Sequence, residues 1–220
     1  MVLPQRLEAL YFVAAKAAEH FSPPVDEERT RIARATKLWL PGAKPLSASG
    51  VFDPCGLILE IPPKSGYYWC TPKEALTFAC TGGDGVHYSY LSSDSLSPSV
   101  VPVVMTLPAN DKHNFVVADS IDEFLGLGYH VGWFALEGIA YDPEEAVQYF
   151  AQAGSDCPDY RSVALQSLGI ERNAPDSKST RLEFLRSHLS IQPVSLSLDR
   201  IAELTERYAS YLIVPDDPPA

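Results

Sequence analysis

The stretch FACTGGDGVHYSYL, residues 78–91, holds the side chains whose types and spacing best suit chemistry. Asp84 lies between glycines and His87 follows three residues later, so a carboxylate and an imidazole stand close enough for acid–base work. A phosphate-binding loop of the GxxxxGK[ST] type needs a lysine that does not follow here, and the chain contains no GxSxG nucleophile elbow. Two interpretations remain: a catalytic or ligand-cradling loop, and a sharp turn that leads into a strand.

The residues around Asp84 favour the turn. Glycine, asparagine and aspartate tolerate a positive φ at little cost, so Asp84-Gly85 is typical of a tight turn between strands. The following VHYSYL pattern predicts a strand, and a single histidine in a strand is more often hydrogen-bonded within the fold than catalytic. We predict a turn, and retain as the alternative a small hydrolase-like enzyme with a site around Asp84 and His87.

The other reactive residue types form no recognisable constellation. The five histidines are scattered without HExxH or HxH spacing. The four cysteines have no CxxC partner, which indicates reduced thiols. Paired acids at 122–123 and 144–145 could serve hydrolysis, but acids at helix starts also complement the helix dipole. We therefore predict no catalytic residue, no metal and no cofactor; the cysteines are Cys55, Cys70, Cys80 and Cys157.

The charge of the chain is concentrated in one segment. Residues 74–160 hold 13 acids and a single base, Lys112, which is a net charge of −12 within a chain of net charge −11. Such a surface repels nucleic acid and attracts basic proteins. An acidic rim around exposed Tyr and Trp is also the composition of a protein-binding site, since many aromatic residues lie in or beside this segment. The simpler interpretation is a solvated face that aids solubility.

The pattern of elements predicts one α+β domain over residues 1–212, followed by a flexible tail at 213–220. Residues 1–40 read as two helices, 43–118 as strand-rich and 119–212 as helical, with a capping box from Ser120 to Glu123. PKEALTFA, residues 72–79, suggests a helical turn, and Pro102 suggests an edge strand or a bulge. We expect a mixed or antiparallel curved sheet of about five strands, wrapped by N- and C-terminal helices. The predicted strands are GLILEIPP, GYYWC, VHYSYL, VVPVVMTLP and NFVVAD.

The run from Phe78 to Asp142 resembles the SUKH superfamily, which includes fungal cell-wall-synthesis regulators and bacterial immunity proteins. The shared pattern is a GGDG turn, then a strand, then a helix with F-L-x-x-G, here Phe124 to Gly128. The resemblance implies an α+β fold with helices around a curved sheet, and no enzymatic activity. Bacterial members neutralise a cognate toxin, often a nuclease, so it also implies a basic protein partner.

Charge and resemblance together predict a non-enzymatic protein-binding module, and the resemblance implies an immunity protein that neutralises a basic, nuclease-type toxin. No apolar run reaches the roughly 20 residues that cross a bilayer, and charged residues interrupt the N-terminal apolar pattern. We therefore expect a cytoplasmic protein that binds neither membrane nor nucleic acid; its oligomeric state is not predicted. Acids at the turn and at helix starts should be exposed and face the partner: Asp84, Asp119, Asp122, Glu123, Glu144 and Glu145.

Overall fold

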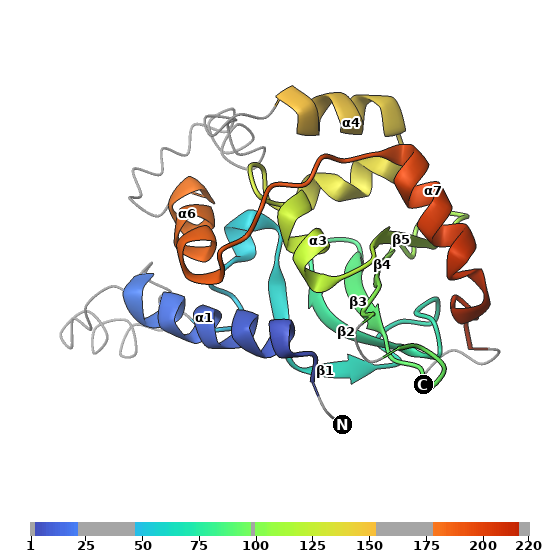
Figure 1. The fold of residues 1–220 in the computed structure, drawn as a ribbon, viewed down its shortest axis with the longest axis horizontal. Coiled ribbons are helices and arrows are strands. Elements are labelled where there is room, and N and C mark those ends of the chain that lie inside the picture. Colours follow the sequence, from blue (N-terminus) through green and yellow to red (C-terminus); the bar gives the residue numbers. More distant parts are fainter. Residues whose placement is uncertain (1–2, 22–46, 98–99, 153–177, 216–220) are drawn as a thin grey trace, which may run out of the picture.

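Five antiparallel strands form the centre of the molecule, in the same order in space as along the chain (Figure 1). The computed structural model describes residues 3–21, 47–97, 100–152 and 178–215. Because each strand pairs with the next one along the chain, the sheet is an open meander with β1 and β5 at its edges. The strands are β1 (Ile58–Ser65), β2 (Ala75–Cys80), β3 (His87–Leu91), β4 (Val103–Thr106) and β5 (Asn114–Ala118).

Helices pack against the large apolar face of this sheet. They are α1 (Gln5–Phe21), α3 (Ile121–Leu127), α4 (Pro143–Gln152) and α6 (Lys178–Leu189), with the short 3₁₀ helices η1 (Asp53–Cys55) and η2 (Phe134–Ala140). Phe124 of α3 stacks on Trp133 with ring centres 5.7 Å apart, and the Trp133 indole donates to the Phe124 carbonyl at 2.9 Å. A Cβ on Gly128 would lie 2.2 Å from the Trp133 ring, so only glycine fits there.

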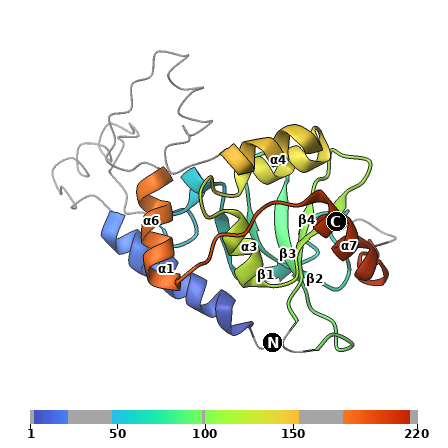
Figure 2. The ribbon, with the colours of Figure 1, turned by 45° about the horizontal axis from the view of Figure 1, so that its top comes forward.

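The opposite face carries α7 (Leu198–Arg207) and a smaller apolar cluster (Figure 2). Leu204 and Tyr208 pack there on Val104 and Val116 of the last two strands. The Val116 N–H, on the open edge of β5, donates to the Thr205 hydroxyl at 3.0 Å. α7 therefore covers an edge that would otherwise present unpaired backbone groups to other chains.

The structure confirms the α+β class and the five-stranded antiparallel sheet with helices from both ends of the chain. It confirms the helix that follows Ser120, whose hydroxyl accepts the Glu123 N–H at 3.1 Å, and the helix that begins at Pro143. The predicted helices at 25–40 and in DYRSVALQSLG (159–169) lie outside the described residues. None of the described helices is long and apolar enough to cross a membrane.

Two local predictions were wrong, and one of the two alternatives for Pro102 is excluded. GYYWC, residues 66–70, forms turns and not a strand, and PKEALTFA contains strand β2 and not a helical turn. Pro102 does not mark an edge strand, because β4 pairs with both β3 and β5. It lies directly before β4, where its missing N–H breaks no pairing, and the expected irregularity follows as a shift of register between Val103 and Val104.

Candidate functional site

The GGDG segment is the turn between β2 and β3, as predicted. Gly82 and Gly85 have φ angles of 82° and 76°, and the Thr81 N–H donates to the Val86 carbonyl at 3.0 Å across the turn. Asp84 lies exposed at its tip. A Cβ on Gly85 would lie 2.9 Å from the Tyr68 ring, so the loop before β2 packs closely against this turn.

His87 is fully buried, and both of its ring nitrogens are used inside the fold. Nδ1 lies 2.7 Å from the Gly85 carbonyl, which can only accept, so Nδ1 carries the proton. Nε2 therefore accepts from the Thr71 hydroxyl at 2.9 Å. Burial lowers the pKa of His87, which keeps the ring neutral. A neutral, buried and doubly bonded imidazole cannot take a proton from a substrate, which argues against the hydrolase-like site around Asp84 and His87.

The polar layer around His87 holds the 66–74 loop against the sheet. The Thr106 hydroxyl donates to the Asn114 side-chain oxygen at 2.7 Å, and the Asn114 amide donates to the Cys70 carbonyl at 3.0 Å. Thr71 anchors the same loop by accepting the Tyr68 N–H at 2.9 Å. Because buried polar groups are costly unless bonded, this network fixes one position for the loop.

The anchored loop presents aromatic side chains to solvent at one end of the sheet. We call this region the turn end: the β2–β3 turn (81–86), the β4–β5 loop (107–113), residues 67–70, and the chain from Glu137 to Glu145. Trp69 is 43% exposed and packs edge-on against His113, and Tyr141 is 60% exposed. The Asn110 amide donates to the Ala140 carbonyl at 3.2 Å, which joins the β4–β5 loop to the segment that carries Tyr141.

The acids of the turn end have no ion-pair partner among the described residues. The pKa of Glu137 is raised, mainly because the side chain is partly buried and also because the negative charge of Asp84 lies nearby. The Asp142 carboxylate accepts the Glu145 N–H at 3.0 Å and so caps α4. Glu137 and Asp142 were not among the predicted contact residues. The sequence signal that could have identified them is that residues 137–145 contain no base to neutralise them. The set is Asp84, Asp111, Glu137, Asp142, Glu144 and Glu145.

The other three predicted contact acids are engaged inside the molecule. Asp119 contacts Arg200 at 3.3 Å and Arg207 at 2.9 Å and accepts the Tyr208 hydroxyl. Glu123 contacts Arg200 at 3.4 Å, and its carboxylate accepts the Asp119 N–H at 2.6 Å.

Asp122 is exposed but pairs with Arg6 of α1 at 2.5 Å. The side chains of Asp119 and Glu123 are only 28% and 22% exposed, so the expectation that they lie free on the surface was wrong. Basic residues of α1 and α7 neutralise these acids, and the ion pairs tie the two helices to the start of α3.

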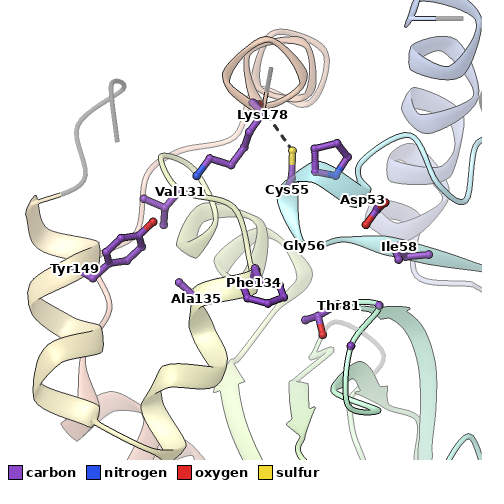
Figure 3. Close-up of a pocket in the computed structure, with 13 residues that line it drawn as sticks. Asp53, Cys55, Gly56, Ile58, Thr81, Val131, Phe134, Ala135, Tyr149 and Lys178 are labelled. Carbon is purple, nitrogen blue, oxygen red and sulfur yellow. Dashed lines mark hydrogen bonds between the residues drawn. The ribbon is translucent and has the colours of Figure 1, made fainter. Parts of the chain in front are cut away.

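A cavity of about 410 Å³ lies beside the turn end, between η1, the glycines of the turn, η2, α4 and the start of α6 (Figure 3). Its walls are mainly apolar, with Ile58, Val131 and Phe134 among them. The Lys178 side chain extends from α6 into this space, and its nitrogen lies near Val131. Cys55 contacts the Lys178 carbonyl through its sulfur at 3.8 Å.

In the described part of the chain, no group of three or more His, Cys, Asp or Glu side chains is placed to hold a metal ion. Cys55, Cys70 and Cys80 are free thiols, as predicted for them, and Cys157 lies outside the described residues. No family model matches the chain, and no curated protein or solved structure matches it either. A functional assignment must therefore rest on the geometry of the site.

Proposed function

We propose that this protein is a non-enzymatic binding module that recognises a basic protein through the turn end. The observation that carries the proposal is the combination of exposed aromatic rings, Trp69 and Tyr141 foremost, with acids that have no ion-pair partner among the described residues. Large aromatic side chains supply most of the affinity at the centre of protein interfaces. Surrounding acids add speed and selectivity by attracting a positively charged surface.

The six predicted contact acids divide into two groups under this proposal. Asp84, Glu144 and Glu145 contact the partner, because they are exposed and unpaired among the described residues. Asp119 and Glu123 serve the fold, and Asp122 is committed to Arg6. Partner binding therefore depends on the end of the sheet near α4 and not on the junction between α3 and α7.

The narrower form of the proposal rests on the resemblance of residues 78–142 to the SUKH superfamily. It makes the protein a cytoplasmic immunity protein, and its partner a basic toxin of the nuclease type. A nuclease needs a basic surface to hold phosphates, and a dense set of carboxylates is able to occupy that surface in place of nucleic acid. The same charge disfavours direct binding to nucleic acid or to an anionic membrane.

The proposal is tested by capture from a lysate of the native host with four forms of the protein. We expect the wild-type chain to retain a basic protein, and Tyr141→Ala and the double variant Glu144→Lys/Glu145→Lys to lose it. The matched control is Glu8→Lys/Glu19→Lys, which makes the same charge change at exposed positions of α1, away from α4 (Figure 1). Loss of capture in the control but not in the α4 variant would place the interface elsewhere.

A further inference from the structure

A lysine side chain from the start of α6 extends into the cavity beside the turn end. Lys178 is only 7% exposed, and among the described residues its ammonium group has neither an ion pair nor a hydrogen bond. Burying an ammonium group is expensive unless an anion or several acceptors compensate it. The first turn of α6 contains no acid to do so.

The position of Lys178 adds to the attraction for an anion. It is the first residue of α6, a helix of 12 residues, and the N-terminal end of a helix carries a partial positive charge. The side chain points into the cavity and not toward solvent (Figure 3). Helix end and ammonium therefore favour negative charge in the same space.

The walls of the cavity restrict the kind of anion. They are mostly apolar, and the cavity volume of about 410 Å³ falls within the range of small-molecule sites. The site supplies one lysine, and the carboxylate of Asp53 lines another part of the same cavity. A single cation does not suit a phosphate or a nucleotide, which carry two or more charges. It suits one carboxylate attached to an apolar body.

We infer that this cavity binds a small monocarboxylate, with the carboxylate on Lys178 and the apolar part against Ile58, Val131 and Phe134. This binding is separate from recognition of the basic partner, because the isolated protein and the small acid suffice for it.

The test is a titration of the full chain with phenylacetate, followed by calorimetry and ligand-observed NMR. We expect saturable binding with a dissociation constant of roughly 1 mM or tighter. Phenylacetamide, which has the same shape without the charge, should bind at least about ten-fold more weakly, since a charge-assisted contact is worth that much or more. Inorganic phosphate should bind more weakly than phenylacetate.

Two variants assign the effect to this cavity. Lys178→Met keeps the apolar stem and should weaken phenylacetate binding about ten-fold or more, whereas Lys16→Met on the exposed face of α1 should leave it unchanged. Ala135→Phe fills the cavity while keeping the lysine and should abolish binding. Thermal melting checks that each variant folds. Lys178→Met should melt at the wild-type temperature or above, because the ammonium group has no contact among the described residues that the substitution would break.

Four results would overturn the inference. These are no saturable binding up to about 10 mM, equal binding by Lys178→Met, phosphate binding tighter than phenylacetate binding, or a large loss of melting temperature in Lys178→Met. The last would show that the ammonium already has a partner within the protein.

Discussion

Replacing Asp119 should destabilise the fold, although its sequence context marks it as a surface acid. Its carboxylate accepts the hydroxyl of Tyr208, a residue that is itself buried against the β5 side of the sheet. A hydrogen bond to a charged group contributes about 1.5–3 kcal/mol, and Asp119→Ala removes it and leaves the Tyr208 hydroxyl without this acceptor. The contacts with Arg200 and Arg207 are more exposed and add little. We therefore expect Asp119→Ala to lose about 2 kcal/mol of unfolding free energy.

The assay is urea unfolding of the wild type, Asp119→Ala, Tyr208→Phe and the double variant. A double-mutant cycle isolates the Asp119–Tyr208 coupling from the rest of each substitution. In a chain of this size a loss of about 2 kcal/mol lowers the melting temperature by roughly 4–8 °C. Glu144→Gln is the control, because an exposed side chain without partners should change stability by less than about 0.5 kcal/mol. Equal effects of Asp119→Ala and Glu144→Gln would refute the division of the acids into structural and binding groups.

The β2–β3 turn, the buried histidine and the buried thiol give three further predictions. Gly85→Ala should lower the free energy of unfolding by about 1–2 kcal/mol in urea, because φ at this position is 76°. Gly83→Ala, where an added Cβ meets open space, should lie within about 0.5 kcal/mol of the wild type. Equal values for the two variants would contradict the turn geometry. Burial lowers the pKa of His87, so on acidification the unfolded state binds a proton at this residue before the folded state does. The free energy of unfolding should therefore fall as the pH drops below about 6.5, and it should fall less in His87→Gln. The same pH dependence in His87→Gln and the wild type would contradict the assignment. Burial raises the pKa of the Cys70 thiol, so at about pH 8 iodoacetamide should modify Cys70 only after unfolding, and rapid labelling of the native protein would show otherwise.

The sequence predicted the strands whose burial is continuous and missed the one whose composition is helical. β3 and β5 are buried along their whole length, and their sequences are rich in residues that favour strands and are flanked by turn residues, so both were recognised. β2 follows Pro-Lys-Glu and contains Ala75 and Leu76, residues that favour helices in isolation. Pairing with strands on both sides overrides that preference, and such pairing is not visible in a local pattern.

The expectation that Asp119 and Glu123 are exposed was wrong for a related reason. Helix-start acids are usually exposed, and this holds for Glu144 and Glu145. Asp119 and Glu123 are covered because two arginines of α7 approach them. In the sequence, Arg200 lies 81 residues after Asp119, and Arg207 lies 88 residues after it. Long-range ion pairs leave no trace in the spacing of one segment. The short separation of Asp84 from His87 in the sequence also does not predict how the two side chains lie: Asp84 is exposed, and the His87 ring turns inward to bind Gly85 and Thr71.

The central claim is that the turn end binds a basic protein, and the most direct measurement is the rate of association with the captured partner at low and high salt. Exposed charges are screened beyond about 8 Å at physiological ionic strength, so association should slow steeply as salt is added. Glu144→Lys/Glu145→Lys should slow association more than it speeds dissociation, and should remove most of the salt dependence. An acidic partner, or a partner that associates equally fast with the charge-reversed protein, would contradict the claim.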